Sequence, residues 1–279
     1  MNYLMCLKRR GEKVKVALVQ FKEAGKKYYF SYEGLTIEPK DLVVVETTRG
    51  VEIGKVYLFK EIEASDLTSE LKPIMRKATE EDIKEDQYNQ TLEHAIVEKT
   101  KHLSIQNELE IKVLGAEYTL DRKRLLIYFE SENRVDFRNL VKDLSEIYHT
   151  RIELRQIGPR DAAKMIGGIG PCGLILCCTT FIGEFDTVSI KMAKNQNIAL
   201  NPQKISGVCG KLLCCIKYED DVYTELKQIM PDINQKIQTE KGLASVVDMN
   251  VIGQKIRVKY IEGGGFEWLS VDQIQLIEG

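Results

Sequence analysis

Six of the seven cysteines of this 279-residue chain lie in two copies of one short pattern. Each copy reads Cys-Gly-x-Ile/Leu-Leu-Cys-Cys, the first at residues 172–178 and the second at residues 209–215. The six cysteines, which we take as candidate cofactor-binding and metal-binding residues, are Cys172, Cys177, Cys178, Cys209, Cys214 and Cys215. Zinc and iron–sulfur centres both take thiolate ligands from proteins. The repeat therefore predicts a thiol-based centre within residues 166–215.

The spacing of the cysteines restricts how they can meet. Within each copy the first and second cysteines are five positions apart. Such positions differ by about 140° around an α-helix and lie on opposite faces of a strand. They can approach each other only where the backbone bends, and the glycine after the first cysteine permits a bend. Because neighbours such as Cys177 and Cys178 point apart, a single centre would use one of each adjacent pair.

The identity of the centre stays open on spacing alone. No histidine lies within residues 166–215, so a zinc site there would need four cysteines. The plant-type ferredoxin spacing, Cys-x₄-Cys-x₂-Cys, is not reproduced. Two other readings are a buried apolar strand, since free cysteine is often a core residue, and a redox switch of vicinal thiols.

The glycines before the first copy do not form a nucleotide site. Residues 168–173 fit Gly-x-Gly-x-x-Gly, but they follow a helix-like segment at 161–166, and Pro171 removes a backbone amide. We interpret them as the bend that presents Cys172. The sequence contains no Walker A pattern, serine nucleophile elbow or His-Glu-x-x-His, so we expect a protein that is not an enzyme.

Composition points to an ordinary globular protein. The chain has 40 Lys and Arg against 42 Asp and Glu, so no overall basic field attracts nucleic acid. The first residues do not resemble a secretory signal, and no apolar run approaches the roughly 20 residues that span a bilayer. We therefore expect a cytoplasmic protein, in which clustered thiols stay reduced and bind metal more often than they form disulfides.

The elements around the cysteines predict an α+β fold, in which a mainly antiparallel sheet with covering helices is flanked by small β-barrel-like N- and C-terminal portions. The expected parts are residues 1–60, an α+β core over 61–235, and 236–279. A long helix is expected over 79–107, which lacks Gly and Pro and begins Thr-Glu-Glu-Asp. Alternation and helical spacing predict strand, strand, helix and strand over 110–155. A further helix is expected at 220–229, and Trp268 in the core of the C-terminal portion.

Three arginines precede the cysteine region: Arg151, Arg155 and Arg160. Arg151 and Arg155 have the same parity and would project from one face of a strand, where they could contact RNA phosphates or the carboxylates of a partner. The alternative, which we favour on sequence alone, is a solvated sheet face paired with nearby Glu.

Several longer motifs carry a family resemblance. They are residues 151–158, 167–173, 189–194, 201–202 and 204–207, together with both cysteine copies. In these motifs the chain closely resembles the bacterial RicT/YaaT family of stage 0 sporulation regulators, from about residue 47 to the C-terminal region.

The resemblance implies a specific function. Proteins of that family are non-enzymatic adaptors that join two small helical partner proteins in a complex carrying 4Fe-4S clusters. The complex acts on RNase Y to promote mRNA maturation, with effects on sporulation, competence and biofilm formation. The resemblance thus favours iron–sulfur over zinc, in a cluster that this chain holds alone or shares with partner subunits. An RNA-binding module and a zinc-stabilised scaffold are the alternative functions.

Overall fold

The computed structural model of the chain describes residues 13–22, 24–63, 67 and 71–276. The chain divides into two compact units, Met1–Glu184 and Phe185–Gly279. The outermost residues of the predicted terminal portions, 1–12 and 277–279, lie outside the described residues. No helix in the described part is long and apolar enough to cross a membrane.

The first unit begins with a five-stranded antiparallel sheet in the order β2-β1-β4-β3-β5. Its strands are β1 (Lys13–Gln20), β2 (Lys27–Phe30), β3 (Leu42–Glu46), β4 (Val51–Glu63) and β5 (Ile74–Lys77). Alternating side chains such as Val19, Val43 and Val56 fill its core. The sheet is not a closed barrel, although an isolated bridge between Ser31 and Pro73 links the chain beside its two edge strands.

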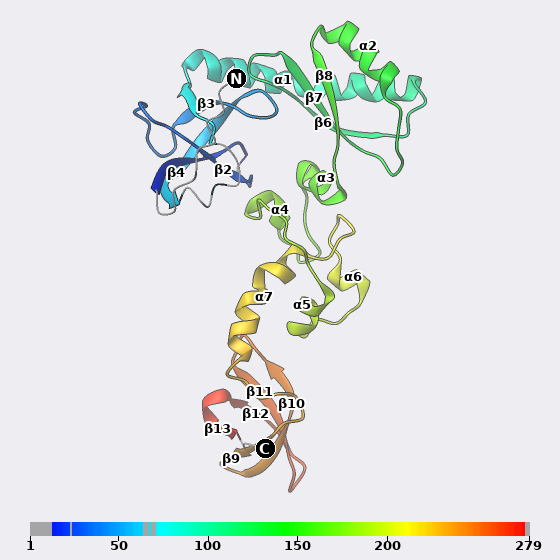
Figure 1. Ribbon diagram of the computed structural model, residues 1–279. Helices are drawn as coiled ribbons and strands as arrows, with labels where there is room; N and C mark the ends of the chain where they lie inside the picture. The colour runs from blue at the N-terminus through cyan, green and yellow to red at the C-terminus, as the bar shows by residue number, and fades with distance from the viewer. Residues whose placement is uncertain (1–12, 23, 64–66, 68–70, 277–279) are drawn as a thin grey trace, which may run out of the picture. The chain divides into compact units, whose positions relative to one another are not determined.

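A three-stranded sheet follows, in the order β6-β7-β8. It consists of β6 (Lys112–Tyr118), β7 (Arg124–Glu130) and β8 (Arg151–Gln156), with β6 antiparallel and β8 parallel to β7. Helices α1 (Glu80–Gln106) and α2 (Arg138–Tyr148) pack on one face (Figure 1). There, Leu103 and Leu144 share a core with Leu125 and Ile127. The α+β fold with antiparallel sheets and covering helices is confirmed.

Helix α1 matches the long helix expected at 79–107, because its ends are capped by residues just outside it. Thr79 is the N-cap and forms a capping box with Asp82, and Asn107 is the C-cap. The guanidinium of Arg76 donates hydrogen bonds to Asp82 and holds the pKa of that carboxyl well below its ordinary range. The capping box and this ion pair fix the start of α1 against β5.

A charged cluster lies on the other face of the three-stranded sheet. Glu117 accepts a hydrogen bond of 2.8 Å from the Tyr128 hydroxyl, pairs with Lys22, and lies 3.7 Å from an Arg49 nitrogen. Burial raises the pKa of Glu117, but these partners outweigh burial and leave it below its ordinary value. Burial, with Glu117 nearby, raises the pKa of Glu93 to about 7. Glu93 lies on α1 and not on this face of the sheet, so the ionised Glu117 acts on a helix carboxyl that binds a proton near neutrality.

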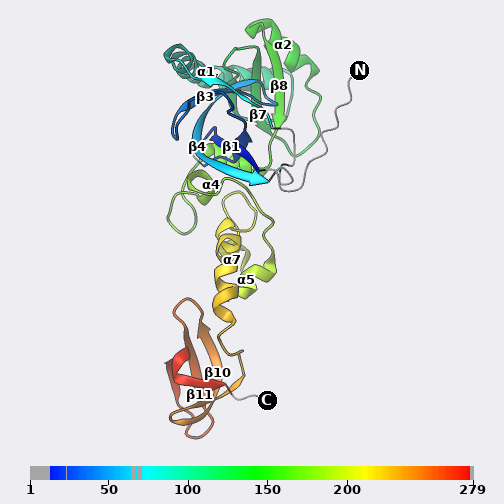
Figure 2. The same cartoon turned by 60° about the vertical axis from the view of Figure 1, so that its left-hand side comes forward.

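The second unit combines short helices with a second five-stranded antiparallel sheet. Its helices are α5 (Ile190–Asn195), α6 (Pro202–Ile205) and α7 (Cys214–Lys227). Helix α5 lies beside α7 in both views (Figures 1 and 2). Ala193, Ile205 and Ile216 form the small core between the three helices. The helix expected at 220–229 thus begins earlier than expected, at Cys214.

The second sheet has the order β12-β11-β10-β9-β13. Its elements are β9 (Lys236–Thr239), β10 (Gly242–Asn250), β11 (Lys255–Tyr260), β12 (Phe266–Ser270), the short 3₁₀ helix η2 (Val271–Gln273) and β13 (Ile274–Leu276). Ile256 and Val258 fill its core, whereas Trp268 is 49% exposed. The core position expected for Trp268 is therefore wrong. The neighbouring Leu269 packs against the core instead, so the alternation of β12 turns Trp268 outward.

Candidate metal centre

The first cysteine copy forms a tight hairpin that leads into a helix. The Gly170 amide donates to the Leu174 carbonyl at 2.8 Å, and the Gly173 amide donates to the Gly170 carbonyl at 2.9 Å. Cys172 is therefore in the middle of a β-turn. Gly173 has a φ of 82°, which glycine adopts without strain. The chain then enters α4 (Cys177–Thr180), so both members of the adjacent pair start a helix.

The second copy repeats this backbone pattern at equivalent positions. The Gly207 amide donates to the Lys211 carbonyl at 2.8 Å, and the Gly210 amide donates to the Gly207 carbonyl at 2.9 Å. Gly210 has a φ of 73°, and α7 begins at Cys214. We call residues 168–178 and 205–215 the first and second cysteine hairpins. The bend that the spacing demanded is present in both, at the glycine after the first cysteine.

The two hairpins belong to different compact units. Cys172 is exposed, Cys178 is buried, and the other four cysteines of the two patterns are partly buried. A methyl group on Gly170 would lie 3.5 Å from the Cys172 sulfur, and one on Gly207 would lie 3.7 Å from the Cys209 sulfur. These are ordinary van der Waals distances, so each of these sulfurs lies directly beside a glycine of its own hairpin.

Each hairpin contains three cysteine thiols. Within the described residues, no three His, Cys, Asp or Glu side chains are already arranged to hold a metal ion. The donor chemistry nevertheless fits a thiolate-ligated centre, because cysteine sulfur is the ligand that both zinc and iron–sulfur clusters take from proteins.

Apolar side chains surround the first hairpin without being buried. Five of them are more than half exposed: Ile166, Ile169, Leu174, Ile175 and Phe181. Ile166 ends α3 (Pro159–Ile166), and Ile169 pairs with Ile175 across the hairpin. Exposed apolar groups of this size are typical of surfaces that contact another macromolecule.

The predicted arginines lie on two elements. Arg151 and Arg155 are on one face of β8, and both pair with Glu153, at 3.6 and 3.2 Å. Arg124 of β7 reaches the same carboxylate at 3.3 Å. The paired sheet face that we favoured is what the structure shows for Arg151 and Arg155. Arg160 lies apart from them on α3. Contact of these arginines with RNA or a partner stays a prediction.

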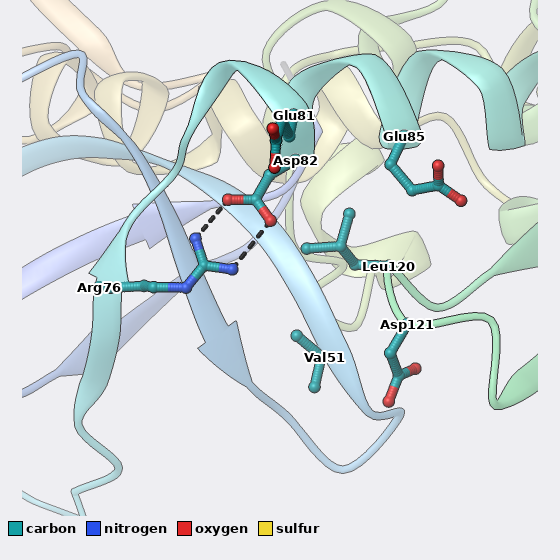
Figure 3. Close-up of a pocket in the computed structure, with 7 residues that line it drawn as sticks. All are labelled: Val51, Arg76, Glu81, Asp82, Glu85, Leu120 and Asp121. Carbon is teal, nitrogen blue, oxygen red and sulfur yellow. Dashed lines mark hydrogen bonds and ion pairs between the residues drawn. The ribbon is translucent and has the colours of Figure 1, made fainter.

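A hollow elsewhere in the first unit is lined largely by acidic residues (Figure 3). It has a volume of about 350 Å³ and is lined by Val51, Arg76, Glu81, Asp82, Glu85, Leu120 and Asp121. The Asp82 carboxylate is held by Arg76, as the dashed lines show. None of the cysteines lines this hollow, so it is separate from the candidate centre.

Two segments of the chain match known protein families. Residues 72–157 match the family described as PSP1 C-terminal conserved region, and residues 187–230 match the one described as PSP1-like protein, third domain. The second cysteine hairpin lies within the latter segment. No solved structure matches the chain significantly.

One bacterial relative is similar over most of its length. Stage 0 sporulation protein YaaT of Bacillus subtilis (strain 168) is 48% identical over 244 residues, which cover 87% of this chain and 89% of the relative. Protein PSP1 of Saccharomyces cerevisiae is 51% identical over 47 residues, 17% of this chain and 6% of that protein. A second fungal protein, from Schizosaccharomyces pombe, matches over a segment of the same length.

Proposed function

Because this chain belongs to the YaaT family of stage 0 sporulation proteins, we propose that it is a non-enzymatic regulatory adaptor that carries an iron–sulfur centre. Membership of a sporulation family supports a regulatory role. The finer proposal is that the chain, with two small helical partner proteins, binds 4Fe-4S clusters and modulates RNase Y-dependent mRNA maturation in the cytoplasm. Sporulation, competence and biofilm formation would depend on that step.

The observation that carries the proposal is the equivalence of the two cysteine hairpins. Both place one cysteine in a β-turn and two at the start of a helix, with the same hydrogen bonds between backbone groups. Buried core cysteines would not need the same turn twice. A shared task for the thiols accounts for a geometry that is kept in two different units.

Ligand counting supports a centre that extends beyond one hairpin. A 4Fe-4S cluster takes four cysteine thiolates, whereas each hairpin contains only three cysteines. At least one ligand must therefore come from outside a given hairpin. When bound, such a cluster supplies a group that oxygen and redox state can alter. The protein's own contribution is to place one thiol of each hairpin in a hydrogen-bonded turn and two at the start of a helix.

The exposed apolar groups of the first hairpin support the partner proposal. Ile169, Leu174 and Ile175 are each more than 60% exposed, and all lie within a few residues of Cys172. Burial of such apolar surface against a partner contributes about 25 cal/mol of binding free energy for each Å² removed from water. A partner seated there would cover the exposed thiol as well.

The test is anaerobic purification of the chain with its partners, followed by iron and sulfide analysis and a visible spectrum. We expect iron and acid-labile sulfide in near-equal amounts. Cys172→Ser and Cys209→Ser should lower both, whereas Cys6→Ser, outside both patterns, should leave them unchanged. Stoichiometric zinc without sulfide would refute the iron–sulfur proposal in favour of a zinc-stabilised scaffold. In that case, a chelator should unfold the protein.

A further inference from the structure

The outer face of the second sheet carries a regular array of cations. Lys255, Arg257 and Lys259 are alternate residues of β11, and all three are exposed. The residues between them, Ile256 and Val258, are fully buried in the core. Alternation along the strand therefore places the three cations on one side of the sheet, at intervals of about 6.6 Å.

Two aromatic rings lie beside these cations on the edge strand β12. Phe266 pairs across the ladder with Lys259, and Trp268 pairs with Arg257. The Arg257 guanidinium carbon is 5.1 Å from the centre of the Phe266 ring, within the range of cation–π contact. Both rings are about half exposed, Phe266 at 56% and Trp268 at 49%. They lie open to solvent, although the sheet has a core in which large apolar side chains could be buried.

The acidic groups nearby leave the face positive. Glu267, between the two aromatics, is turned away and bound by the Lys241 amine at 2.7 Å and the Tyr260 hydroxyl at 2.6 Å. Asp248 of β10 pairs with Arg257 across the ladder and offsets one charge. The residues opposite Lys255 and Lys259 are the neutral Asn250 and Ser245. A protein without overall positive charge thus has a local positive face.

Exposed rings next to regularly spaced cations fit one class of ligand. Unpaired bases stack on aromatic side chains, and lysine and arginine neutralise the phosphates that join them. An apolar protein partner would use the rings but not the row of cations, and duplex nucleic acid would use the cations but not the rings.

We infer that the face formed by Lys255, Arg257, Lys259, Phe266 and Trp268 binds single-stranded RNA. This inference deepens the proposed function, on which the choice of RNA rests, since it gives an adaptor in mRNA maturation a direct contact with the transcript. The cysteine hairpins take no part in the contact.

Trp268 is the only tryptophan of the chain, so its fluorescence reports on this face directly. The full-length protein is titrated with a 12-nucleotide single-stranded RNA, and binding is followed by tryptophan emission and by anisotropy of a labelled RNA. We expect quenching of the emission, and an affinity that falls as salt rises. No quenching and no change in anisotropy would overturn the inference. A response to poly-glutamate but not to RNA would also overturn it, because the face would then bind acidic protein.

Variants separate stacking from charge. Phe266→Ala and Trp268→Ala should each weaken RNA binding about tenfold or more. Arg257→Gln should weaken it and reduce the salt slope by about one unit. The controls are Tyr88→Ala, which removes an equally exposed ring in the first unit, and Lys60→Gln, which removes an exposed lysine there. Equal losses in variants and controls, or equal binding of duplex RNA, would contradict recognition by this face.

The outcome is independent of the metal centre. Thermal unfolding checks that each variant folds, and its iron content after anaerobic purification should equal that of the parent protein. Loss of RNA binding with iron retained is expected for the variants of this face. A parent protein that contains iron but does not bind RNA would refute this inference alone. A parent protein that binds RNA but contains no iron would refute only the iron–sulfur proposal.

Discussion

Gly173 and Gly210 hold the same place in the two cysteine hairpins, and both have positive φ values, 82° and 73°. Each donates its amide to a glycine carbonyl three residues earlier, which closes the turn around the first cysteine. No heavy atom lies within 4 Å of the position that a Cβ would take at either glycine. Only the backbone conformation, and not crowding, therefore requires glycine at these sites.

The first prediction concerns these two glycines. Gly173→Ala and Gly210→Ala should each destabilise their turn by about 1–2 kcal/mol, the cost of left-handed backbone for a residue with a Cβ. Because the turn positions Cys172 or Cys209, anaerobic iron content should fall as well. Gly34→Ala is the matched control, since Gly34 has a φ of 77° and an equally open surrounding but lies far from the cysteines in sequence. Iron loss in the control as well would contradict a specific role of the turns.

A second prediction follows from the proton held near neutrality by Glu93. The pKa of Glu93 in the folded protein, about 7, lies above the ordinary value of 4.5. Protonated Glu93 therefore favours the folded state. The contribution of Glu93 to the free energy of unfolding should be greatest below pH 4.5 and should fall as the pH rises through 7. Glu93→Gln should remove this dependence and stabilise the protein at pH 8 by about 1–2 kcal/mol, allowing for solvent screening. Urea unfolding at pH 6 and pH 8 measures this difference in stability. The control is Glu98→Gln, at a side chain that is 46% exposed.

The third prediction tests how the loop between β3 and β4 meets the three-stranded sheet. A Cβ on Gly50 would lie 2.7 Å from the Thr119 methyl group, and Gly50 has a φ of 138°. Gly50→Ala should therefore cost about 2–4 kcal/mol, combining steric overlap with backbone strain. In a Thr119→Ser background the overlap disappears and the cost should fall to about 1–2 kcal/mol. An unchanged cost in that background would show that the contact is not made.

The fourth prediction concerns the start of α1. Thr79→Ala removes the side chain that accepts from the Asp82 amide and should destabilise the first unit by about 1 kcal/mol. Thr79→Ser should restore most of that loss. Thr91→Ala, at an exposed site within the same helix, should be neutral or slightly stabilising because alanine favours helix. Chemical unfolding of the three variants decides between a capping role and a general effect of threonine.

Local signals in the sequence were enough for much of this fold. The capping by Thr79 itself was not predicted, but charge, the lack of Gly and Pro, and the acidic start after Thr79 located α1, because these signals lie close together in sequence. The same is true of the hairpin bends at Gly173 and Gly210. The same-parity rule also placed Arg151 and Arg155 on one face of β8, where they share Glu153.

Features that depend on residues distant in the sequence were not predicted correctly. Trp268 was expected in the core because large aromatic residues usually are, yet Ile256 and Val258 already fill that space. One pattern could have predicted that Trp268 is exposed. Polar and apolar residues alternate along β11, and Phe266 and Trp268 are likewise two positions apart on β12. Helix α7 was expected too late, since nothing local marks Cys214 as its first residue; the N-cap Leu213 makes no side-chain cap. The division of the cysteines between two units has no local signal either.

Strand β12 lies at the edge of its sheet, where exposed strands tend to pair with other chains. An edge strand offers unpaired backbone groups, and one with two exposed aromatic rings favours pairing with other copies of the chain. Charges on the neighbouring strand oppose such pairing, because two copies would bring like charges together. We therefore expect variants that neutralise Lys255, Arg257 and Lys259 together to precipitate at lower concentration than the parent chain.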